Sequence, residues 1–169
     1  METTVIIALG SNRRHGRFGA PAQVVDAAIA DLEARGVRIL ARSRIHVTDP
    51  VGPSERMYAN AAVLAATALA PEALLTLLKS VERDFGRRRQ RRWGARVLDL
   101  DLIAYGRAVV PTRLGWRTAR GLVVPHRAMH QRRFVLDPVV EIAPDWRHPV
   151  LGLSTRELHA RLTKARSVD

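Results

Sequence analysis

The stretch RVLDLDLIAYG at residues 96–106 places two aspartates, Asp99 and Asp101, inside a run of leucines. Side chains two residues apart in a β-strand point to the same face of a sheet. We therefore expect a strand whose leucines enter the core and whose carboxylates stand together on the other face, with Cα atoms about 6–7 Å apart. Such a strand needs a sheet to bury its leucines and partners to compensate its charges.

The aspartate pair has two interpretations. Neighbouring carboxylates repel each other unless a cation lies between them. Mg²⁺ is one candidate, because it takes oxygen ligands and is often held by one or two carboxylates together with substrate phosphates. The alternative is an ordinary polar face whose aspartates pair with nearby arginines. The D-x-D spacing is too short a pattern to decide between them.

The segments around this strand predict a sheet covered by helices. Strands are expected over residues 4–10, 37–48, 58–67 and 96–105, and helices over residues 21–36 and 71–86. Both helical segments begin with proline, end with glycine and carry one apolar face. The order β-α-β-β-α-β predicts an α+β fold with a ferredoxin-like core, a mainly antiparallel sheet and extra C-terminal helices. The last helix is expected after Ser154, which has capping-box spacing to Glu157.

The composition is that of a single globular domain over residues 1–169, with 47% hydrophobic and 26% charged residues. The chain has no cysteine, which excludes disulfides and zinc–thiolate sites. Its N-terminal stretch lacks the basic region of a signal peptide, and no apolar run approaches the roughly 20 residues of a membrane span. We therefore expect a cytoplasmic protein that does not associate with membranes.

The net charge of +12 predicts an anionic partner, which can be a nucleic acid, a membrane surface or a phosphorylated small molecule. Five of the six residues 87–92 are arginine, whose planar guanidinium suits phosphate oxygens. Alone, such a run reads better as a solvated basic loop or a nucleic-acid patch. Beside two carboxylates it favours a magnesium–triphosphate site, because that site needs both signs of charge. Nucleic acid is the less favoured partner, since YANAAVLA at residues 58–65 lacks RNA-binding aromatics.

Tyr58 and Asn60 should share one face of their strand. An aromatic ring beside a carboxamide can hold a flat nitrogen heterocycle by stacking and paired hydrogen bonds. Glu82, Trp93 and Phe134 could add a carboxylate and two more rings. Core packing is the simpler interpretation for each aromatic residue, whereas an amide in an apolar strand must find polar partners.

Six motifs follow one another along nearly the whole chain. They are ALGSN (8–12), TDPVG (48–52), YAN (58–60), VERDFGRRR (81–89), RWGARVLDLDL (92–102) and PHRAMHQRRFVLDPVVEIAPDWRHP (125–149). Together they resemble the 6-hydroxymethyl-7,8-dihydropterin pyrophosphokinase family of the folate pathway. The resemblance implies a ferredoxin-like fold and transfer of pyrophosphate from ATP to the hydroxymethyl group of a reduced pterin, releasing AMP. It also leads us to expect a monomer.

The resemblance implies roles for individual residues. Asp99 and Asp101 resemble the ligands of two Mg²⁺ ions that bridge the phosphates of ATP. The residues implied in pterin binding are Thr48, Val51, Tyr58, Asn60, Trp93 and Phe134. Those implied in ATP binding are Glu82, Arg89, Trp93, Arg96, Leu102, His126 and Arg132. The catalytic residues implied are Arg87, Arg89 and Arg96, which would stabilise the triphosphate.

The chain departs from the family pattern at several positions. Ala95 stands where the family usually has proline, and Lys79 stands where glutamine is expected. The segment 107–121 is longer than usual, and the linker PSERM at 53–57 is short. A relative that acts on another pterin, or that has lost activity, therefore remains an alternative.

Overall fold

The computed structural model describes residues 1–48, 56–86 and 97–165. Its elements are β1 (Thr3–Ser11), α1 (Pro21–Ala34), β2 (Arg38–Arg42), β3 (His46–Thr48), β4 (Tyr58–Thr67), α2 (Pro71–Asp84), β5 (Asp99–Tyr105), the 3₁₀ helix η1 (Met129–Gln131), α3 (Arg133–Ile142) and α4 (Thr155–Ala165). The sheet has the order β2-β4-β1-β5, with β3 also paired to β4, and every pairing is antiparallel. The predicted α+β, ferredoxin-like fold is confirmed.

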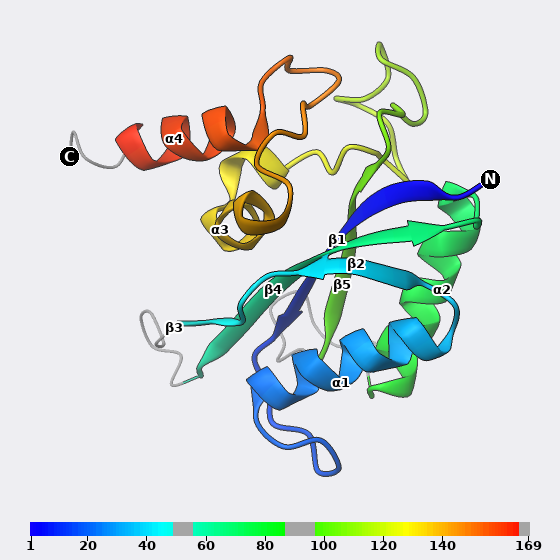
Figure 1. The fold of residues 1–169 in the computed structure, drawn as a ribbon, viewed down its shortest axis with the longest axis vertical. Coiled ribbons are helices and arrows are strands. Elements are labelled where there is room, and N and C mark those ends of the chain that lie inside the picture. The colour runs from blue at the N-terminus through cyan, green and yellow to red at the C-terminus, as the bar shows by residue number, and fades with distance from the viewer. Residues whose placement is uncertain (49–55, 87–96, 166–169) are drawn as a thin grey trace.

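The sheet lies between two layers of helices (Figure 1). One core fills the space between the sheet and helices α1 and α2, and it takes Val5, Ile7 and Leu9 from β1. A second core lies between the other face and the C-terminal helices, and it takes Ile6 and Ala8. Both faces of β1 are therefore buried, which explains why its sequence is a continuous apolar run rather than an alternating one.

Helices α1 and α2 follow the sequence signals closely. Each begins at a proline, and glycines with positive φ (88° at Gly36 and 90° at Gly86) lie just beyond their ends. The buried residues of α1 are Val24, Val25, Ala28, Ile29 and Leu32. The apolar faces of these helices form one side of the main core.

The single strand expected over residues 37–48 is wrong, because the structure divides it into β2 and β3. Buried Ser43 causes the break: its hydroxyl accepts a hydrogen bond from the backbone N–H of Ala62 at 2.9 Å and donates to the carbonyl of Arg44 at 2.7 Å. A side chain thus replaces part of the strand ladder. The following β3 then pairs with the beginning of β4, which sets His46 opposite Asn60.

The C-terminal helix has the capping box expected from the sequence. The backbone N–H of Ser154 donates to the Glu157 carboxylate at 2.7 Å, and the N–H of Glu157 donates to Ser154 Oγ at 3.1 Å. The long segment before η1 is a loop, and it packs against the protein through Trp116. That indole is 1% exposed, and its Nε1–H donates to the carbonyl of Pro125 at 2.7 Å.

Candidate active site

Strand register brings the polar residues of three strands onto one face of the sheet. Gly10 of β1 pairs with Asn60 of β4 on one side and with Asp99 of β5 on the other. One row further along, Ala8 pairs with Asp101. Directly paired residues of antiparallel strands share a face. Asn60 and both aspartates therefore lie on the face that α3 and α4 cover further along.

Gly10 forms the floor of this row. A Cβ added there would lie 3.0 Å from Oδ1 of Asn60, closer than real Cβ contacts allow without movement of the neighbour. Glycine at this position therefore leaves room for the Asn60 carboxamide above β1. The glycine of the motif ALGSN thus contributes to the site by leaving space for a neighbouring side chain.

Strand β5 has the alternation expected from its sequence. Leu98, Leu100 and Leu102 are at most 4% exposed and belong to the main core. Asp99 and Asp101 are partly exposed on the opposite face. The leucines bury the strand and thereby hold both carboxylates at one edge of the sheet.

Asp101 lies among charges of both signs. Burial raises its pKa, and the negative charge of Asp99 raises it further. The nearby cationic groups His126, Lys79 and Arg132 act in the opposite direction. The structure therefore places two carboxylates and several potential phosphate-binding cations within electrostatic reach of one another.

A bulge in β5 positions His126 beside the aspartates. The register between β1 and β5 shifts at Ile103, and the carbonyl of this residue accepts a hydrogen bond from the backbone N–H of His126 at 2.8 Å. The imidazole Nδ1 accepts from the N–H of Ala128 at 3.2 Å. Burial lowers the pKa of His126, while the charge of Asp101 partly offsets this effect.

Two large aromatic side chains are exposed on this side of the molecule. Tyr58, at the beginning of β4, is 38% exposed, and Phe134, in the first turn of α3, is 51% exposed. The guanidinium carbon of Arg132 lies 5.7 Å from the Phe134 ring centroid. Thr48 is paired with Tyr58 at the exposed end of β3. Exposed aromatic rings such as these offer faces on which a flat ring can stack.

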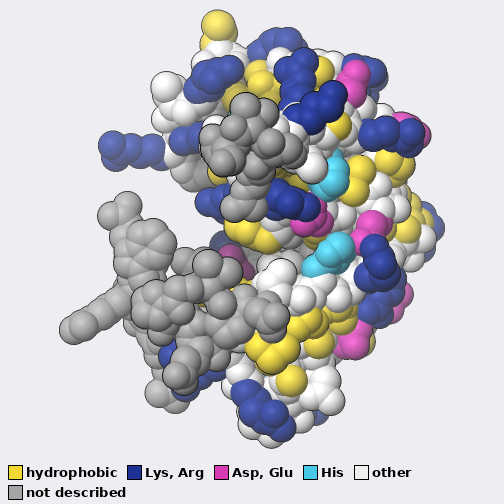
Figure 2. Space-filling view, turned by 90° about the vertical axis from the view of Figure 1, so that its left-hand side faces the viewer, with side chains coloured by type: hydrophobic (Ala, Val, Ile, Leu, Met, Phe, Trp, Pro, Cys, Tyr) yellow, Lys and Arg dark blue, Asp and Glu magenta, His cyan; other side chains and the backbone are white. Residues whose placement is uncertain are grey.

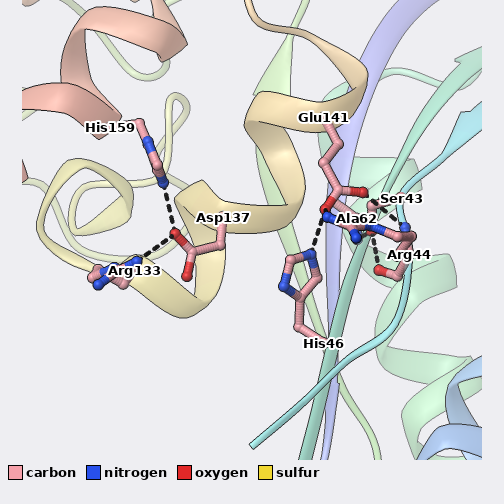
Figure 3. Close-up of polar contacts among 8 residues, drawn as sticks. All are labelled: Ser43, Arg44, His46, Ala62, Arg133, Asp137, Glu141 and His159. Atoms are coloured by element: carbon pink, nitrogen blue, oxygen red, sulfur yellow. Dashed lines mark hydrogen bonds and ion pairs between the residues drawn. The ribbon is translucent and has the colours of Figure 1, made fainter. Parts of the chain in front are cut away.

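Glu141 of α3 ties this helix to the sheet (Figure 3). Its carboxylate accepts from the backbone N–H of Arg44 at 2.9 Å and lies 2.6 Å from Nε2 of His46. Burial acts to raise the pKa of Glu141, but the hydrogen bonds from Arg44 and His46 outweigh it and lower the pKa overall. No pattern in the sequence predicts these contacts of Glu141, because they depend on the break at Ser43, after which His46 lies beside α3.

The side chains of two residues expected to bind ATP are buried. Leu102 is packed in the core with α1 and α2, so only its backbone lies near Asp101. Glu82 is fully buried on α2, and its Oε1 accepts a hydrogen bond from the backbone N–H of Leu100 at 2.8 Å. The expected site residues Val51, Arg87, Arg89, Trp93 and Arg96 lie outside the described residues.

The carboxylates of Asp99 and Asp101 fit a cation whose remaining ligands come from a substrate. Within residues 1–48, 56–86 and 97–165, no group of three or more His, Cys, Asp or Glu side chains is placed to hold a metal ion. Two carboxylates remain, which is the ligand number that Mg²⁺ commonly takes from a protein when phosphates and waters complete its shell.

Figure 2 shows Lys and Arg side chains gathered over the upper half of one side of the molecule.

No helix in the described part of the chain is both long and apolar enough to cross a membrane.

Solved structures and curated sequences match this chain over most of its length. Two Plasmodium falciparum HPPK-DHPS crystal structures, the wild type and its complex with pteroate, have TM-scores of 0.76 and 0.74 and are 12% identical in sequence. Both matches cover the whole of this chain. This chain spans less than half of the length of each matched chain, 42% and 44% respectively. These structures support the fold alone.

Closer sequence relatives carry one enzyme name, 2-amino-4-hydroxy-6-hydroxymethyldihydropteridine pyrophosphokinase. The protein from Methylorubrum extorquens is 40% identical over 95% of this chain and 94% of its own length. The protein from Pseudomonas aeruginosa is 36% identical over 86% of this chain and 83% of its own. The model of the 7,8-dihydro-6-hydroxymethylpterin-pyrophosphokinase family matches residues 6–144. The resemblance in the motifs is thus confirmed, and the chain belongs to the 7,8-dihydro-6-hydroxymethylpterin-pyrophosphokinase family.

Proposed function

We propose that this protein transfers pyrophosphate from ATP to the hydroxymethyl group of 6-hydroxymethyl-7,8-dihydropterin, with release of AMP. Family membership supports the reaction class. The observation that carries the proposal for this chain is the register that sets Asn60, Asp99 and Asp101 on one face of the sheet. A carboxamide that could hold a heterocycle is thereby a neighbour of carboxylates that could hold cations.

Asp99 and Asp101 are the residues that would hold two Mg²⁺ ions together with the phosphates of ATP. Divalent cations bound there supply positive charge to the phosphate oxygens. His126 and Arg132, which act electrostatically on Asp101, would bind the same phosphates. Arg87, Arg89 and Arg96 would contribute guanidinium groups, as the family motifs imply.

The pterin would lie against Tyr58, Asn60 and Phe134. The carboxamide offers both a donor and an acceptor to the ring edge, and the exposed aromatic rings offer stacking surfaces. Thr48 lies at the same end of the sheet. Val51 and Trp93 complete the set that the motifs imply.

The chemistry demands positioning and charge neutralisation more than a strong base. The bond that forms joins the pterin hydroxymethyl oxygen to the β-phosphorus of ATP. The bond that breaks joins this phosphorus to the oxygen bridging to the α-phosphate, and AMP leaves with that electron pair. The hydroxyl proton passes to solvent. The protein's own groups hold the two substrates in line and exclude water from the reacting phosphorus.

We further propose that residues 1–169 form one domain and that the protein acts as a cytoplasmic monomer. The first of these proposals rests on the sheet, whose two faces pack on helices from both ends of the chain.

The direct test is an assay of AMP formation. Protein, ATP, Mg²⁺ and the reduced pterin should give AMP and the pterin diphosphate, and both Asp99→Asn and Asp101→Asn should lower kcat/KM at least 100-fold with the fold retained. Glu33→Gln, which alters an exposed carboxylate of α1, is the control. Near-normal turnover in both aspartate variants would refute the cation role. Steeply salt-dependent RNA binding without AMP formation would instead support an RNA-binding function.

A further inference from the structure

The peptide between the two aspartates is held from outside the sheet. Strand β5 is an edge strand, because the strand order ends with it. The backbone N–H of Leu100, which separates Asp99 from Asp101, donates to Oε1 of Glu82 on α2 at 2.8 Å. A helix side chain thus occupies the position that a further strand would take.

This contact lies in a costly environment. Leu100 and Glu82 are both 0% exposed. A buried backbone N–H without an acceptor destabilises the fold, and a buried carboxylate destabilises it more unless it is paired. Lys79 compensates part of the negative charge, with Nζ at 3.3 and 3.4 Å from the two carboxylate oxygens. An apolar residue in place of Glu82 would leave the Leu100 N–H without an acceptor. The buried carboxylate therefore indicates that this N–H has to be held.

We propose that Glu82 is a positioning residue that holds the Leu100 peptide and thereby fixes the Asp99–Asp101 pair for cation binding. Its carboxylate acts through the backbone of β5, by accepting the hydrogen bond from the Leu100 N–H. The inference rests on the proposed role of the two aspartates as cation ligands. Groups that orient metal ligands typically change metal affinity 10- to 100-fold when they are removed.

Lys79 is part of the same group of contacts. Its ammonium nitrogen lies 3.3 Å from Oε2 of Glu82. This cation therefore offsets part of the charge of the positioning carboxylate. Glutamine, expected at this position from the family pattern, would lack this charge.

Three variants and two measurements test the proposal. Mn²⁺ binding is followed by electron paramagnetic resonance with α,β-methylene-ATP, an analogue that cannot be cleaved between its α- and β-phosphates. Amide exchange at Leu100 is followed by NMR. Glu82→Gln keeps a carbonyl oxygen for the Leu100 N–H, whereas Glu82→Leu fills similar space without an acceptor. Glu72→Gln, at an exposed position of the same helix, is the matched control.

We expect slow exchange of the Leu100 amide in the unmodified protein. Glu82→Gln should bind Mn²⁺ within about 3-fold of the unmodified protein, and Glu82→Leu should bind 10- to 100-fold more weakly with faster exchange at Leu100. Glu72→Gln should change neither quantity. Circular dichroism checks that the fold is kept.

Three results would overturn the proposal. An equal loss of Mn²⁺ affinity in Glu82→Gln and Glu82→Leu would show that the negative charge itself is required. Normal affinity in both would show that the contact has no bearing on the site, and rapid exchange at Leu100 in the unmodified protein would show that the edge is not held. If Glu82→Leu does not fold, amide exchange at Leu100 in the unmodified protein and in Glu82→Gln still tests the proposal. Failure of the unmodified protein to bind Mn²⁺ with the analogue would instead contradict the proposed function.

Discussion

Gly10 shows at the scale of one residue how an absent side chain shapes the candidate site. It is paired with Asn60 and Asp99 on its two sides, and no Cβ stands between them. The Asn60 carboxamide extends over β1 into the space this leaves. The position of the amide is thus set by its neighbour as much as by its own strand.

Gly10→Ala should weaken pterin binding at least 10-fold, because the added methyl group would come within 3.0 Å of Asn60 Oδ1 and displace the amide. Isothermal titration with the pterin measures the effect. Gly16→Ala is the control, since a Cβ at that position meets no described atom within 4 Å. Equal affinities in Gly10→Ala and the unmodified protein would remove Asn60 from the proposed pterin site.

His148 makes stability depend on pH. This histidine is fully buried, and its Nδ1 accepts hydrogen bonds from the N–H groups of Val150 and Leu151 at 3.2 and 3.1 Å. Burial, together with the charge of His130, lowers its pKa to about 4. The unfolded chain binds this proton near pH 6.5 and the folded protein only near pH 4, so the free energy of unfolding falls as the pH decreases between these values.

The contribution of His148 to this loss should be about 2 kcal/mol between pH 7 and pH 5. His148→Asn keeps an acceptor for the two N–H groups but does not titrate, so its stability should fall less over this range. Urea unfolding at the two pH values measures the difference. Parallel losses in the variant and the unmodified protein would show that His148 is not the titrating group.

At the scale of elements, α3 connects two parts of the candidate site, the Phe134 ring and the strands of the sheet. Its first turn carries Phe134, and Glu141 near its end holds the segment between β2 and β3. Asp137 lies one turn before Glu141, and its Oδ1 is 2.7 Å from Nε2 of His159 on α4 (Figure 3). The helix therefore has one carboxylate for the sheet and another for the C-terminal layer.

Glu141→Ala should weaken pterin binding about 5- to 20-fold, because α3 would lose its tie to the strands that carry Thr48, Tyr58 and Asn60. Mn²⁺ affinity should stay nearly unchanged, since β5 is held separately. Asp137→Ala is the matched control: it removes a comparable tie to α4 and should leave the pterin affinity intact. Fluorescence titration measures both variants, and equal losses would indicate a general effect on α3.

The sequence predicted most elements because their signals are local. Proline and glycine mark the ends of α1 and α2, and the alternation around Asp99 and Asp101 marks β5. The break at Ser43 and the bulge at Ile103 were not predictable, since each depends on a hydrogen bond to a distant segment. The motifs lead us to expect Glu82 in ATP binding, but only the packing of α2 against β5 shows that its carboxylate is buried and accepts from the Leu100 N–H.

At the scale of the whole molecule, the positive charge is unevenly distributed. Residues 102–136 contain seven arginines and no acidic residue. Two of these arginines donate to backbone carbonyls, Arg113 to Pro149 and Arg127 to Trp116. Their charges are thus left to act on anions in solution, and the aspartate pair lies at the beginning of this segment.

Raising NaCl from 50 to 300 mM should lower kcat/KM for ATP about 3- to 10-fold, because salt screens the attraction between this surface and the anionic nucleotide. The reduced pterin carries no net charge, so kcat/KM for the pterin at saturating ATP should change much less. Steady-state kinetics with each substrate varied in turn measure both effects. Equal sensitivity for the two substrates would show that long-range attraction does not assist ATP binding.

The two-sided sheet also has a consequence for synthesis on the ribosome. By the time Tyr105 has left the exit tunnel, all five strands have been made, and α1 and α2 can cover one face. The opposite face still exposes Ile6, Ala8, Ala62 and Ile103, because the helices that cover it come from residues 129–165. A nascent chain at this stage has the acidic pair in place but an open apolar surface, which makes it a substrate for chaperones before it can be an enzyme.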